Sequence, residues 1–154
     1  MSEIYQSPHS VVGDQKRGNK LVALIIGVTT DMGITLLAGS VFGGIVMFML
    51  LKRGVHQDQL MQQYEKLSPQ IMHSPMGYVL TAVGMFASFI GAYLCARYAN
   101  HREYWLAAVL ALVAILVYLL SPAETYSQAT MLVLEIVNVG VIFLGTYVHV
   151  RNKG

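Results

Sequence analysis

Residues 21–51 decide the fold class: they read LVALIIGVTTDMGITLLAGSVFGGIVMFMLL and contain a single charged side chain, Asp31. A helix needs about 20 consecutive apolar residues to cross a hydrocarbon core. As a helix this stretch would measure about 46 Å at 1.5 Å per residue. It is therefore long enough to span a bilayer, with a tilt or with one end protruding.

Three more apolar windows follow, at residues 76–98, 104–120 and 130–150. The chain is 55% apolar and 12% charged, whereas a soluble domain has about 25% charged residues. A soluble helical bundle also shows polar helix faces, and residues 104–120 show none. We therefore predict an all-α integral membrane protein built as a four-helix bundle, with helices at about 21–51, 76–98, 104–120 and 130–150.

The polar segments lie outside these windows. Residues 1–20 have no apolar period and are predicted to form a polar cytoplasmic tail, 21–150 the transmembrane domain, and 151–154 a second short tail. Between the first two windows, Leu60, Tyr64 and Leu67 recur at helical spacing, which predicts a short external amphipathic helix ending before Pro69. That helix is expected to lie on the outer leaflet or to pack back on its own protein.

The basic residues predict the orientation in the membrane. Seven lie on one side, in the N-terminal segment, the second connection and the C-terminal tail, and three lie in the first connection, residues 52–75. The side richer in Lys and Arg usually faces the cytoplasm. Both termini are therefore predicted to be cytoplasmic.

Asp31 is the residue that fits worst in an apolar helix. A carboxylate near the middle of a bilayer costs about 2.5–3.5 kcal/mol even on insertion scales, so it has to be protonated or held by partners. Gly27 and Thr35 share a helical stripe with it, and this stripe is expected to face protein. One interpretation is a proton- or ion-linked site. The other is that the helix begins late and leaves Asp31 near the cytoplasmic interface.

The last window carries a second polar stripe, formed by Glu135, Asn138, Thr146 and His149. Counted along the helices, Glu135 lies about 22 Å from the cytoplasmic end and Asp31 at most about 15 Å. Direct contact between the two carboxyls is therefore not expected. Glu135 is either a buried relay group, with Asn138 beside it, or a residue of the outer interface within two turns of the helix start.

Small residues at a spacing of four predict where helices approach each other. They are Gly39 and Gly43 in the first window, and Gly84, Ser88 and Ala92 in the second. Such stripes allow close helix contact in membranes. We predict that the first two long helices meet along Gly39, Gly43, Gly84 and Ser88, with a dimer face as the alternative use of the stripe.

Several functional classes find no support in the sequence. It has no dinucleotide or phosphate-binding glycine motif, no nucleophile elbow and no HExxH motif. With one Cys and five scattered His, no metal site is expected, and no cofactor either. The net charge of +2 does not indicate a nucleic-acid partner. The chain is therefore not expected to be an enzyme.

Residues 91–97, GAYLCAR, resemble the G-[GA]-Y-x-x-A-R turn of small four-helix bacterial membrane proteins of unknown function. The first helix of those proteins often carries an Asp after a Gly, as Gly27 and Asp31 do here. The resemblance covers about the first three long helices and implies a multi-pass protein of the bacterial inner (plasma) membrane. It implies no reaction.

Two functions remain as hypotheses. The first is a non-catalytic helix-bundle module that associates with itself or with a larger membrane complex. The second is a small transporter or channel subunit in which Asp31 and Glu135 act as proton or ion relay groups. Whether both carboxyls line a water-accessible cavity distinguishes the two.

Overall fold

A computed structural model describes residues 19–99, 102–120 and 128–153, which contain helices and no strand. Residues 1–18 of the predicted tail (1–20) and the connection at 121–127 lie outside the described residues. In chain order the elements are α1 (Lys20–Lys52), the short 3-10 helix η1 (Gln57–Gln59), α2 (Leu60–Met72), α3 (Pro75–Ala99), α4 (Glu103–Leu120) and α5 (Gln128–Lys153).

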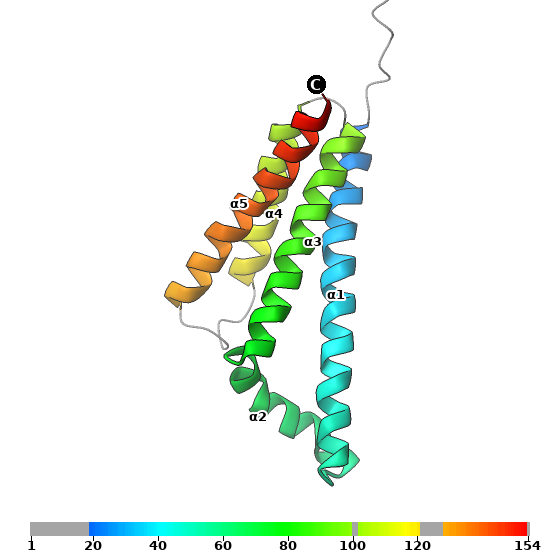
Figure 1. Cartoon of the computed structure of the whole chain (residues 1–154), viewed down its shortest axis with the longest axis vertical. Helices are drawn as coiled ribbons and strands as arrows, with labels where there is room; N and C mark the ends of the chain where they lie inside the picture. Colours follow the sequence, from blue (N-terminus) through cyan, green and yellow to red (C-terminus); the bar gives the residue numbers. More distant parts are fainter. Residues whose placement is uncertain (1–18, 100–101, 121–127, 154) are drawn as a thin grey trace, which may run out of the picture.

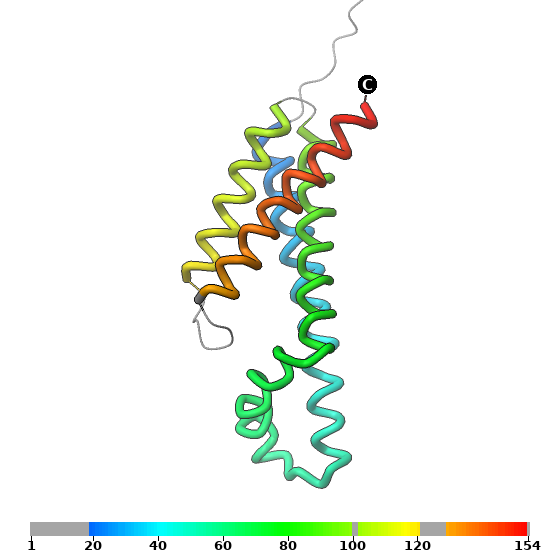
Figure 2. Tube along the Cα trace, turned by 60° about the vertical axis from the view of Figure 1, so that its left-hand side comes forward, coloured from blue at the N-terminus to red at the C-terminus, as the bar shows by residue number. Residues whose placement is uncertain are grey.

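The bundle is arranged around α3, which contacts α1, α2, α4 and α5. Helices α1 and α3 run side by side along the long axis, and α4 and α5 pack together beside the upper part of this pair (Figure 1). Helix α2 links the lower ends of α1 and α3, and this part of the molecule projects beyond α4 and α5 (Figure 2). The start of α1 and the end of α5 lie at the same end of the bundle.

Four of these helices, α1, α3, α4 and α5, are long and apolar enough to cross a membrane. Their windows match the four predicted ones to within three residues at each end. Large apolar side chains stand exposed all along them, for example Leu36, Phe86, Leu119 and Ile136. Exposed apolar surface of this extent is typical of a face that meets lipid or protein, and it is compatible with a multi-pass membrane protein.

Local signals explain where α1 begins and ends. The side chain of Asn19 accepts a hydrogen bond of 3.0 Å from the backbone N–H of Leu21 and caps the first turn. At the other end Gly54 has a φ of +83°. Its N–H donates to the Leu51 carbonyl and the N–H of Val55 donates to the Leu50 carbonyl, which together form a Schellman motif.

The prediction that the amphipathic helix ends before Pro69 was wrong, because α2 continues through Pro69 to Met72. A proline inside a helix removes one backbone hydrogen bond, but the next turn still forms, with His73 N–H donating to the Pro69 carbonyl. The end is set instead by Pro75, which starts α3 and disfavours a helical conformation at Ser74.

The core consists mainly of small side chains, which let the helix backbones come close. A Cβ added at Gly91 would lie 2.7 Å from the Gly27 carbonyl oxygen, and one at Gly145 would lie 2.5 Å from the Phe89 carbonyl oxygen. The first pair marks the crossing of α1 and α3, and the second marks the crossing of α3 and α5. Both crossings need glycine, because any side chain would separate the backbones.

The predicted contact between the first two long helices is present, but it does not run through Gly39 and Gly84. A Cβ at either position would meet no atom within 4 Å. Gly39 follows Gly27 by twelve residues, which turns it about 120° away from the contact face. A Cβ at Gly43 would face the Tyr64 hydroxyl of α2 at 3.6 Å. This part of the helix-packing prediction was wrong, although Ser88 and Ala92 are buried as expected.

Candidate functional site

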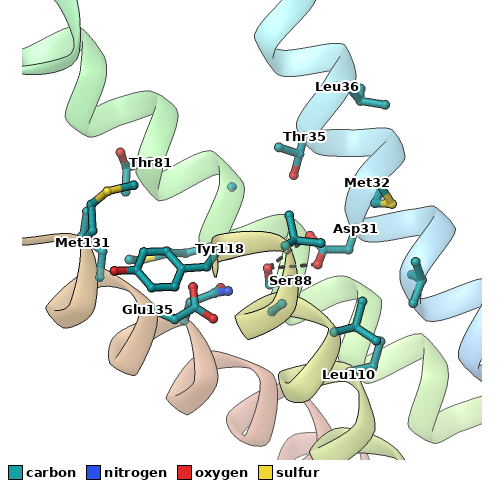
Figure 3. A pocket seen from close by; sticks show the side chains of 18 residues that line it. Asp31, Met32, Thr35, Leu36, Thr81, Ser88, Leu110, Tyr118, Met131 and Glu135 are labelled. Atoms are coloured by element: carbon teal, nitrogen blue, oxygen red, sulfur yellow. Dashed lines mark hydrogen bonds between the residues drawn. The ribbon is translucent and has the colours of Figure 1, made fainter. Parts of the chain in front are cut away.

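Asp31 lies at the start of the fourth turn of α1 and is paired with a hydroxyl of α3. The Ser88 hydroxyl lies within hydrogen-bond distance of both carboxylate oxygens, at 3.1 Å from Oδ1 and 3.2 Å from Oδ2 (Figure 3). Asp31 follows Gly27 by one helical turn, and Ser88 precedes Gly91 by three residues. The glycine crossing therefore brings two short polar side chains within hydrogen-bond distance of each other.

The hydroxyls of Thr29 and Thr35, two further threonines near Asp31 on α1, do not take part in this hydrogen bond. The Thr29 hydroxyl donates to the Ile25 carbonyl of its own helix, at 2.6 Å. Thr35, a predicted site residue, points into the space between the helices one turn beyond Asp31 (Figure 3). The hydrogen-bond donor of Asp31 thus comes from Ser88, which the sequence predicts only as a packing residue.

Glu135 and Asn138 of α5 line the same space as Asp31. Both carboxyls belong to one cavity of about 460 Å³ between α1, α3, α4 and α5. In Figure 3 Asp31 enters it from α1 and Glu135 from α5, on facing sides. The expectation that the two carboxyls do not touch agrees with this arrangement, because no bond joins them.

The walls of the cavity are mostly apolar. Besides Asp31, Thr35, Ser88, Glu135 and Asn138, polar atoms come from Thr81 and Tyr118, and the Thr81 hydroxyl donates to the Gly77 carbonyl at 3.0 Å. The three methionines that line it are Met32, Met85 and Met131. Gly84 also lines the cavity, and its missing side chain leaves part of this space open.

Sequence reasoning missed Tyr118 and the methionines as site residues. A signal for Tyr118 exists, since it is the only polar side chain in α4 after Trp105. The methionines carry no such signal. A methionine in an apolar helix packs equally well against lipid, a neighbouring helix or an empty space.

Glu135 contributes a buried carboxyl oxygen, Oε1, that has no hydrogen-bond partner among the described residues. A buried polar atom without a partner carries a desolvation cost of about 1–3 kcal/mol, and more if it is charged. This oxygen therefore lacks the hydrogen bond that buried polar atoms normally make, and a proton on the carboxyl or a bound molecule would supply it.

The polar groups at the other end of α5 form a separate cluster. Lys153 pairs with Glu103 of α4 at 3.2 Å, and the His149 ring meets the Tyr93 ring edge-on with 5.5 Å between centroids. His149 lies about 21 Å along the helix from Glu135. The predicted polar stripe of α5 is thus divided between the cavity and this end of the bundle.

Within residues 19–99, 102–120 and 128–153, no three His, Cys, Asp or Glu side chains are grouped as metal ligands. Comparison with protein-family models, with curated proteins and with solved structures finds no match. The resemblance of residues 91–97 to small four-helix bacterial membrane proteins therefore stays a prediction.

Proposed function

We propose that the chain is a multi-pass protein of the bacterial inner membrane, with α1, α3, α4 and α5 crossing the bilayer and both termini in the cytoplasm. The exposed apolar side chains on these four helices support insertion. The seven-to-three distribution of basic residues supports the orientation. In this orientation α2 lies on the outer side, against the ends of α1 and α3.

We further propose that it works as a small transporter or channel subunit, in which Asp31 and Glu135 relay protons. The observation that carries this proposal is that both carboxyls, on different helices, line the same cavity. Ionisable residues inside a membrane are costly, and those that line a cavity mark proton or ion pathways. Ser88, Thr35 and Asn138 supply further hydrogen-bonding groups along its walls.

The second candidate is a structural module that associates with itself or with a larger membrane complex. The projecting end of α1 favours it, since Ile45, Phe48 and Met49 stand exposed there, beyond α4 and α5. A purely structural bundle, however, does not need two carboxyls in an apolar cavity, one of which has a buried oxygen without a hydrogen-bond partner among the described residues. The cavity therefore favours the relay function over the structural module, although the sequence alone placed the structural module first.

Purified protein in liposomes with a trapped pH-sensitive dye tests the relay. A pH gradient is imposed with potassium and valinomycin present, so that charge movement does not limit the proton flux. We expect flux through the wild type and its loss in Asp31→Asn and Glu135→Gln. Glu65→Gln is the matched control, because Glu65 is exposed on α2 away from the cavity. Equal flux in all four proteins would refute the relay and favour the structural module.

A further inference from the structure

The charge of the cavity restricts what can bind there. Two of its lining residues carry carboxyls, and none of those that the structure describes is Lys, Arg or His. The remaining titratable group on these walls is the Tyr118 phenol. A carboxylate buried without a positive partner is strongly unfavourable. The cavity is therefore unsuited to anions, and a ligand that enters while a carboxyl is ionised has to be positively charged.

The two carboxyls differ in the hydrogen-bond donors that the protein provides for them. Both oxygens of Asp31 lie within hydrogen-bond distance of the Ser88 hydroxyl, whereas Glu135 Oε1 is buried without a donor among the described residues. Neither carboxyl thus has a positively charged partner in the described lining, and Glu135 additionally lacks a hydrogen-bond donor for its buried oxygen. A proton satisfies it in the empty cavity, and a cation can replace that proton.

The walls indicate that this cation has an apolar body. Metal ions such as Ca²⁺ require six to eight oxygen ligands, and here most of the lining is Leu, Val, Ala and Met. The volume of about 460 Å³ falls in the range of about 300–1,000 Å³ that is typical of small-molecule sites. Tyr118 offers an aromatic ring for a cation, and the three methionines offer flexible side chains that adapt to ligand shape.

We propose that the cavity binds a monovalent organic cation with an apolar body, an alkyl- or arylammonium ion, in exchange for the proton of Glu135. In this step the O–H bond of the Glu135 carboxyl breaks and the proton leaves to water. The resulting carboxylate then pairs with the cation, and the net charge of the cavity does not change. Asp31 remains bonded to Ser88 and supplies a second carboxyl facing the ligand. This inference rests on the proposed relay function and names its substrate class.

Benzyltrimethylammonium is a suitable probe, because it is permanently charged and cannot itself release a proton. Its neutral isostere is neopentylbenzene, in which a carbon replaces the nitrogen. The full chain in mild detergent is titrated with each compound, following heat by calorimetry and protons by a pH indicator in weak buffer. We expect release of about one proton per bound cation. Binding of the isostere should be at least about tenfold weaker and release no proton.

Three variants test whether Glu135 is the residue that exchanges its proton for the cation. Glu135→Gln should abolish proton release, Asp31→Asn should weaken cation binding, and Glu65→Gln should behave as the wild type. Equal binding of the cation and its isostere by the wild type would overturn the proposal without relying on any variant. So would full proton release by Glu135→Gln.

The proton relay and the binding of an organic cation can be refuted independently of each other. Carboxyl-dependent proton flux in liposomes without binding of benzyltrimethylammonium would leave the relay standing and exclude this substrate class. Proton-coupled cation binding in detergent without proton flux in liposomes, whether benzyltrimethylammonium is present or absent, would leave the binding site standing and exclude the transport function.

Discussion

The glycine crossing of α1 and α3 allows a prediction whose size follows from the structure. In Gly91→Ala the new Cβ would lie 2.7 Å from the Gly27 carbonyl oxygen and 3.1 Å from the Asp31 Cβ. Carbon and oxygen atoms at helix contacts normally stay about 3.3 Å apart or more. The two helices would therefore have to separate by about 0.6 Å. A gap of this size already removes a quarter to a half of the dispersion energy of the contacts that it opens.

The expected cost is that of an overpacked core, about 1–3 kcal/mol. This cost is partly offset, because alanine has a higher helix propensity than glycine and stabilises the helix by about 1 kcal/mol. The control Gly84→Ala gains the same propensity without a clash, because no atom lies within 4 Å of its added Cβ. The difference in unfolding free energy between the two variants should therefore equal the clash, about 1–3 kcal/mol.

The measurement is reversible unfolding in mixed micelles, with a denaturing detergent as the titrant and helix content as the signal. Gly91→Ala should unfold at a lower denaturant fraction than Gly84→Ala. If the two variants have the same free energy of unfolding, the helices do not cross at Gly27 and Gly91. The local geometry that places Ser88 beside Asp31 would then also be in error.

Two further predictions concern the same bundle. Asp31→Asn keeps an oxygen for the Ser88 hydroxyl and should fold normally. Asp31→Leu leaves the Ser88 hydroxyl without its partner and should lower the free energy of unfolding by about 1–3 kcal/mol. Equal stability of the two variants in the same titration would mean that the bond between Asp31 and Ser88 does not stabilise the fold. For the topology, in a Cys95→Ser background, a new thiol at Gln62 should react with an impermeant reagent in intact cells, while one at Gln15 should not, and the reverse labelling would place the termini outside.

The helices themselves could be predicted from the sequence because the cause is local. Apolar stretches such as 104–120 satisfy their backbone groups only as helices when they are removed from water. Pro75 marks a boundary because its φ is fixed, and Gly54 marks one because it can adopt a positive φ. The exception is Pro69, where the loss of a single hydrogen bond was insufficient to end α2.

The two carboxyls of the candidate site stand out in the sequence, but the arrangement of the site could not be predicted. Asp31 and Glu135 stand out in the sequence because a carboxyl in an apolar helix needs a compensating partner. Nothing in the sequence pairs Asp31 with Ser88, since these residues are 57 positions apart and meet only through the helix crossing. Tyr118 likewise joins the site from α4, where its role depends on which way the helix is turned.

The sequence by itself determined that the chain forms long apolar helices, where each begins and ends to within a few residues, and which residues are too polar for such helices. Only the tertiary structure decided which glycines make contact: Gly27 and Gly91 form the crossing of α1 and α3, and Gly39 and Gly84 do not. It also decided that both carboxyls line one cavity. The reason is that helix formation depends on neighbours a few residues away, whereas the rotation of each helix about its axis depends on the packing of all the others. Successive side chains point about 100° apart around a helix. In a helix that is apolar on all sides, the local sequence does not indicate which of these directions faces the neighbouring helices.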